Sequence, residues 1–203
     1  MTSLDFLSGF EPLDSQKAKF LLPRGLPFWK SFNHQHKAIV LLFHGYTATT
    51  FVVKPIAEEL EKHKIDSAAL LFPGHGWKDT KKAKEELSAV KYKQWLQAAR
   101  NEIQKARKRY EKVCAFGQSM GGAVALVMAA EGLLDGVAVG SAAVQSNIIV
   151  RMAMATVGWM NVNISNNVEL PYETESYAFN NLKSANQVIK LGAYAKNQMS
   201  KIR

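Results

Sequence analysis

Gly117-Gln118-Ser119-Met120-Gly121 is the stretch of this 203-residue chain that decides the fold. It fits the G-x-S-x-G pattern, in which a serine lies on a sharp turn between a strand and a helix. Residues 113–116 form a short apolar run typical of a buried parallel strand. Residues 122–130 are apolar on all sides and predict a buried helix, with Gly132 as its C-terminal cap. Ser119 is therefore the candidate nucleophile, between two glycines at positions where a side chain would collide with the turn.

A second motif follows another apolar run. Residues 39–43 predict a strand that leads into His44-Gly45-Tyr46-Thr47. Acyl transfer requires two backbone N–H groups aimed at the developing oxyanion. Met120, the residue after the serine, and Tyr46, in the loop after this early strand, are the candidate donors. We interpret His44 as a hydrogen-bonded residue that shapes the loop rather than as a catalytic base.

A third apolar run, residues 68–72, ends in Pro73-Gly74-His75-Gly76. This pattern predicts a buried strand and a tight turn at the same edge of the sheet. We interpret His75 as a histidine that closes the turn. A role as base or ligand is the alternative.

The three motifs, in this order, resemble the α/β-hydrolase superfamily, in particular its branch of bacterial carboxylesterases and monoacylglycerol lipases, which are labelled serine aminopeptidase-like. The similarity is good over residues 36–142 and weak elsewhere. The resemblance implies a doubly wound, mostly parallel sheet with an inserted cap. It also implies a small-molecule acyl ester as substrate, Ser119 as nucleophile, and Tyr46 and Met120 as oxyanion donors.

The chain departs from this family after the serine. In the family an aspartate and then a histidine follow the nucleophile, but here no histidine follows Ser119, and Asp135 is the only later aspartate. We therefore expect a fold that lacks the last strands, with the acid and base not assignable. The alternative is a non-catalytic, truncated or degenerate hydrolase-fold protein that binds a ligand or partner. Esterase, lipase, thioesterase and peptidase activities share the same turn, so the substrate stays open.

The composition limits the partners. The net charge of +9 raises the possibility of nucleic-acid binding, but the lysines and arginines cluster around a predicted helix and are typical of a solvated surface. Cys114 is the only cysteine and lies in a predicted buried strand, which excludes an internal disulfide. We see no signal peptide and no apolar run of about 18 residues. We expect a cytoplasmic enzyme with no cofactor, metal or nucleic acid, whose oligomeric state is open.

The alternation of apolar strands and amphipathic helices predicts the organisation of the chain. Residues 1–142 are the expected hydrolase core, residues 143–183 the cap, and residues 184–203 a helix that returns to the core. Within the core we expect an edge strand at residues 20–22, a helix starting near Pro55, one long helix over residues 88–112 and a strand at residues 136–140. In the cap, methionines and Trp159 either line an acyl pocket or attach the cap to the core.

Overall fold

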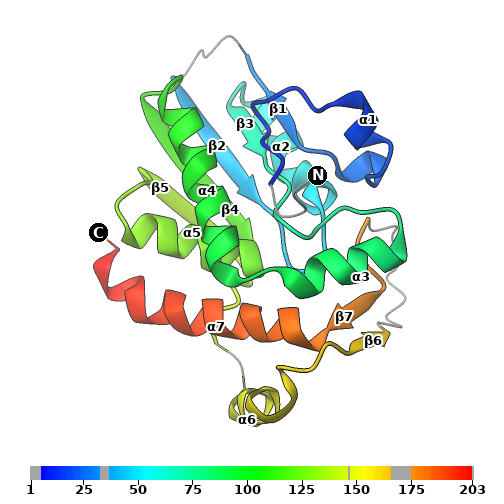
Figure 1. Cartoon of the computed structure of the whole chain (residues 1–203). Helices are drawn as coiled ribbons and strands as arrows, with labels where there is room; N and C mark the ends of the chain where they lie inside the picture. The colour runs from blue at the N-terminus through cyan, green and yellow to red at the C-terminus, as the bar shows by residue number, and fades with distance from the viewer. Residues whose placement is uncertain (1–5, 33–36, 146, 166–174, 203) are drawn as a thin grey trace.

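The core of the molecule is a twisted sheet. The computed structural model describes residues 6–32, 37–145, 147–165 and 175–202. Within them, five strands pair in the order β1-β3-β2-β4-β5 (Figure 1). β2, β3, β4 and β5 are parallel, and β1 is antiparallel to β3. The bounds of the strands are Phe28–Lys30 (β1), Ala38–Phe43 (β2), Asp66–Ala69 (β3), Lys112–Gln118 (β4) and Gly136–Gly140 (β5).

Helices cover both faces of this sheet, so the predicted doubly wound α/β class is confirmed. The side chains of β2 alternate between the faces, as the period of two in a strand requires. Ile39, Leu41 and Phe43 pack with residues of α4 (Tyr92–Arg107) and α5 (Met120–Ala130). Leu42 packs on the opposite face, against Val53 and Ala57, beside α2 (Lys54–Lys62).

The carboxyl ends of the parallel strands meet at one edge, below the sheet in Figure 1. Helices α3 (Thr80–Ala89) and α7 (Leu182–Gln198) lie along this edge, and α6 (Ile148–Val157) lies farther out. A small second sheet pairs β6 (Asn163–Ser165) with β7 (Phe179–Asn181). The loops that follow β2, β3 and β4 therefore open towards these elements.

Two expected elements differ from the structure. The long helix predicted over residues 88–112 is α4 and is shorter at both ends, since residues 88–89 end the separate helix α3, Val90 and Lys91 are extended, and α4 ends at Arg107. Asp79 begins α3 by accepting a hydrogen bond from the Lys82 N–H at 2.7 Å. Residues 20–22 do not form a strand, since Pro23 starts the short turn η1 (Pro23–Gly25). Only Leu21 makes a bridge, to Trp77.

Other core predictions are confirmed, except that the strand predicted at residues 68–72 is β3 and ends at Ala69, and that Cys114 is not fully buried as expected. Pro55 lies in the first turn of α2, and β5 has the predicted bounds. Gly132 follows α5 with φ +70°, as a left-handed helix end requires. Cys114 is half-buried in β4, and burial raises the pKa of its thiol. Among the described residues, no helix is long and apolar enough to cross a membrane.

The insertion between β5 and α7 leaves several large apolar side chains exposed, although its composition suggested that they line a pocket or attach the insertion to the core. Only part of residues 143–183 is described, because positions 146 and 166–174 lie outside the described ranges. Met154 is buried, and the Gly158 carbonyl accepts a hydrogen bond from Asn186 on α7 at 3.2 Å. Met152 and Trp159 are 66% and 74% exposed. These two side chains therefore do not attach the insertion to the core.

Candidate active site

Ser119 lies at the junction of β4 and α5, where the sequence predicted it. Its backbone has φ 52° and ψ −113°, a conformation that non-glycine residues adopt rarely and at a cost in free energy. The Ser119 N–H donates to the Gly140 carbonyl at 2.9 Å, and its carbonyl accepts from the Ala143 N–H at 2.9 Å. The chain leaving β5 thus holds the strained turn, and the Ser119 side chain is partly exposed.

The glycines on either side leave no room for a side chain. A Cβ on Gly117 would collide with the carbonyl of Gly121, and a Cβ on Gly121 would collide with the carbonyl of Phe43. Both contacts are with backbone, which cannot turn aside as a flexible side chain can. The close approach of α5 to the end of β2 therefore requires glycine at position 121.

The loop after β2 lies beside this turn. β2 and β4 are neighbours, with Phe43 opposite Gly117, so the next residues of both strands emerge at the same edge. A Cβ on Gly45 would be 3.5 Å from the Cβ of Ser119. Met120 is the first residue of α5, where backbone N–H groups have no partner within the helix. The structure thus brings the loop containing Tyr46 next to the N-terminus of α5.

The side chain of Tyr46 makes contacts that the sequence did not reveal. Its hydroxyl contacts the Ser184 hydroxyl at 2.7 Å, donates to the Asn181 carbonyl at 3.0 Å and accepts from the Asn181 N–H at 3.2 Å. Burial raises the pKa of this phenol. Tyr46 therefore ties the loop after β2 to the start of α7.

His44 is fully buried and both of its ring nitrogens are engaged. Nε2 accepts the N–H of Phe72 at 3.1 Å, so the proton lies on Nδ1, which donates to the Gly45 carbonyl at 2.9 Å. Burial holds the pKa of His44 well below its ordinary value, and the nearby His75 acts in the same direction. The ring has no nitrogen left to take a proton from Ser119, which confirms that His44 shapes the loop.

His75 is also buried in the turn after β3. Its Nδ1 lies 3.0 Å from the Pro73 carbonyl, and its ring stacks parallel to that of Tyr177 with centroids 6.3 Å apart. Burial lowers the pKa of His75 to about 4. Its Nε2 has no hydrogen-bond partner among the described residues.

The remaining candidates for acid and base lie elsewhere. Asp135 accepts from the Val113 N–H at 2.7 Å and pairs with Arg107 at 2.7 Å, at the amino end of β4. These contacts, the backbone hydrogen bond above all, lower the pKa of Asp135. His63 is exposed at the end of α2. Within the described ranges, no histidine or carboxylate is hydrogen-bonded to Ser119.

The buried histidines predict a loss of stability in acid. A group whose pKa is lowered on folding stabilises the native state above its unfolded pKa, and this stabilisation is lost as the pH falls towards the folded pKa. For His75, with a folded pKa of about 4, the loss between pH 7 and pH 5 should be roughly 2 kcal/mol. Urea unfolding measures the free energy of unfolding at the two pH values. The difference between the two free energies should be smaller in His75→Phe than in wild type, by about this amount. The variant His63→Phe, at an exposed position, is the matched control, and an equal pH dependence of wild type and His75→Phe would contradict the assignment.

The chain is similar to known proteins over most of its length. The family model described as serine aminopeptidase, S33, matches residues 34–201. A search of curated proteins finds no match.

Several solved structures have the same fold. One, reported for the metagenome-derived lipolytic enzymes LipS and LipT, has a TM-score of 0.79 and 18% identity, over 90% of this chain and 74% of that chain. The monoacylglycerol lipase of Paleococcus ferrophilus has a TM-score of 0.66 and 16% identity, over 87% and 74%. A thermostable carboxyl esterase from Bacillus coagulans has a TM-score of 0.63 and 14% identity, over 100% and 77%. With its parallel sheet, its strained serine turn and a family match over most of its length, this chain belongs to the serine aminopeptidase S33 family of α/β hydrolases.

Proposed function

We propose that the chain acts on carboxylic esters through an acyl-enzyme formed on Ser119. The observation that carries this proposal is the strained backbone of Ser119, held between β4 and α5 with Gly45 beside it. Backbone strain of this kind is kept where the surrounding structure compensates for it, often at functional sites. The relatives named above are lipolytic enzymes, a monoacylglycerol lipase and a carboxyl esterase, which favours an acyl ester as substrate.

The reaction proceeds in two steps. The Ser119 Oγ attacks the ester carbonyl, its proton passes to a base, and the alcohol leaves with a proton. Water then attacks the acyl-enzyme, releasing the carboxylic acid and restoring the serine. The N–H groups of Met120 and Tyr46 stabilise the oxyanion in both steps, since both lie at the carboxyl edge of the sheet beside the serine. We assign the described residues of the insertion, 143–145, 147–165 and 175–183, to a cap at this edge.

One observation favours the alternative of a protein that binds without turnover. Both ring nitrogens of His44 are hydrogen-bonded to backbone groups, Nδ1 of His75 lies beside the Pro73 carbonyl, and His63 lies beside Glu59. Among the described residues, none of these histidines is hydrogen-bonded to Ser119. A serine without a base is a weak nucleophile at neutral pH. We therefore propose that the chain by itself turns over esters slowly.

Hydrolysis of p-nitrophenyl butyrate tests the role of Ser119. With imidazole added as a base, Ser119→Ala should lose the rate increase seen in wild type, because no hydroxyl remains to form the acyl-enzyme, while the residual rate from the oxyanion donors persists. The matched control is Ser141→Ala, since Ser141 also has a positive φ, of 50°, and lies just after β5. An imidazole-dependent rate that is unchanged in Ser119→Ala would overturn the proposal.

A further inference from the structure

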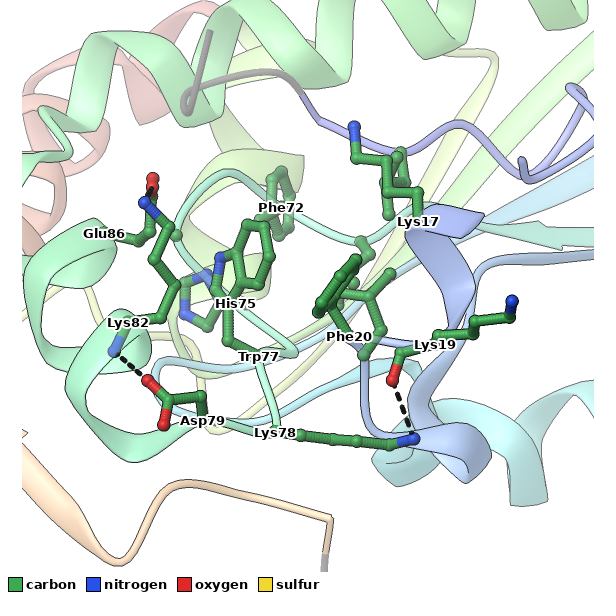
Figure 2. A pocket seen from close by; sticks show the side chains of 14 residues that line it. Lys17, Lys19, Phe20, Phe72, His75, Trp77, Lys78, Asp79, Lys82 and Glu86 are labelled. Carbon is green, nitrogen blue, oxygen red and sulfur yellow. Dashed lines mark hydrogen bonds and ion pairs between the residues drawn. The ribbon is translucent and has the colours of Figure 1, made fainter. Parts of the chain in front are cut away.

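The structure contains a cavity that Ser119 does not line. It has a volume of about 410 Å³, within the usual range of small-molecule sites. It lies between the N-terminal segment, the turn after β3 and helix α3 (Figure 2). No part of the mechanism proposed above uses it.

Backbone hydrogen bonds hold the walls of this cavity together. Leu7 and Leu71 exchange two bonds of 3.0 and 2.9 Å, which attach the N-terminal segment beside β3. Farther along, the Leu22 N–H donates to the Gly76 carbonyl at 2.8 Å, and the Lys78 N–H donates to the Phe20 carbonyl at 2.9 Å. The two segments are thus fixed on both sides, so the cavity exists before any ligand enters.

Most of the lining is apolar and aromatic. Figure 2 shows the rings of Trp77 and Phe20 facing each other, with Phe72 behind them. Leu71 and Phe72 are buried, whereas Phe20 is 60% exposed at the margin. Such a lining binds an apolar or aromatic body.

His75 presents a hydrogen-bond acceptor to this apolar space. The Pro73 carbonyl can only accept, so the Nδ1 of His75 carries the proton and Nε2 has a free lone pair. The ring stays neutral at pH 7 because burial lowers its pKa to about 4. His75 lines the cavity, is only 2% exposed, and its Nε2 has no partner among the described residues.

Glu86 on α3 presents a second acceptor. Its Oε1 pairs with the Lys82 ammonium at 2.7 Å, while its Oε2 is buried without a partner in the described part of the chain. Glu86 also lines the cavity and is 2% exposed. A buried polar atom without a hydrogen bond costs free energy, which a ligand bearing a donor would recover.

The charge around the cavity selects among possible donors. Lysines 17, 19, 78 and 82 all line it, and Lys82 already neutralises Glu86. These ammonium groups would repel a cationic donor, whereas they would not repel a neutral hydroxyl. We propose that this cavity binds an uncharged apolar alcohol, whose hydroxyl donates to His75 Nε2 or Glu86 Oε2 and whose body lies between Trp77 and Phe20.

Calorimetric titration with para-propylphenol tests this proposal, with para-propylanisole as the matched ligand that lacks the donor. We expect the phenol to bind folded wild type about fivefold more tightly than the ether, because the net free energy of one hydrogen bond changes a dissociation constant by about this factor. The Ser119→Ala variant should bind the phenol as wild type does, because Ser119 does not line the cavity. The NMR shift of the His75 Nε2 nitrogen should move on addition of the phenol and not of the ether.

Two pairs of variants locate the site. Phe20→Ala should weaken both ligands, whereas Ile149→Ala, at a similarly exposed apolar position on α6, should not. Glu86→Met combined with His75→Phe should abolish the preference for the phenol, while Glu85→Met, on the exposed face of α3, should preserve it. The ratio of the two affinities reports on the acceptors even where a variant is less stable. Equal binding of phenol and ether by wild type, absence of binding, or loss of binding in Ser119→Ala would overturn the proposal.

Discussion

Replacement of Gly121 by valine is expected to destabilise the protein by about 3 kcal/mol or more. The Cβ of any residue at this position would collide with the Phe43 carbonyl, and the carbonyl of His44 lies almost as close. Both obstacles are backbone, at the end of β2 and at the start of the loop that leads to Tyr46. Accommodating valine therefore requires α5 to move away from β2, which would also displace Ser119 from Gly45.

Thermal unfolding measures this effect. For a domain of this size, the melting temperature should fall by roughly 6–12 °C. Gly132→Val is the control, because Gly132 has φ +70° but no atom within 4 Å of its added Cβ. That variant should lose only the cost of a strained backbone, about 1–2 kcal/mol. An unchanged melting temperature of Gly121→Val would show that the tight turn does not exist as described.

The second large effect concerns the rate of ester hydrolysis. The chain should hydrolyse p-nitrophenyl butyrate orders of magnitude more slowly than an enzyme with a complete triad, at most roughly a thousandfold faster than water. The reason is that no described histidine is hydrogen-bonded to Ser119, so the oxyanion donors act without a base. The rate should rise steadily with hydroxide concentration, and added imidazole should increase it by serving as the missing base.

A pH–rate profile distinguishes slow hydrolysis without a base from rapid turnover with a histidine as base. A steady rise without a plateau, together with rescue by imidazole in wild type but not in Ser119→Ala, would agree with slow hydrolysis. Rapid turnover with a sigmoidal profile centred near a histidine pKa would contradict it. His34 and His36, which lie outside the described residues, would then be the first candidates for the base.

The core of the fold was predictable because its signals are local. Short apolar strands, the glycines of the turn and the proline at the start of α2 each report on their immediate backbone, and the structure has them as predicted. The start of α4 was placed too early because two extended residues, Val90 and Lys91, separate it from α3 within a continuous amphipathic pattern. Periodicity alone does not detect such an interruption.

Features that depend on contacts between distant segments could not be read from the sequence. The tie from Tyr46 to Ser184 joins residues 138 positions apart, and the Leu7–Leu71 bridge forms a wall of the cavity beside α3. Glu86 carried only the weak signal of a lysine four residues before it, which is typical of an exposed helix pair. Its burial arises from the packing of α3 against the turn after β3. The same packing hides His75, whose sequence context indicated only a tight turn.

Covalent labelling tests most directly the claim that Ser119 is the nucleophile. The chain, incubated with excess fluorophosphonate and digested with trypsin, yields one peptide that contains residues 113–151. Fragmentation of this peptide should place a single adduct on Ser119, and the Ser119→Ala variant should carry none there. An adduct on another residue, or a folded wild-type chain that remains unlabelled after prolonged exposure, would contradict the assignment.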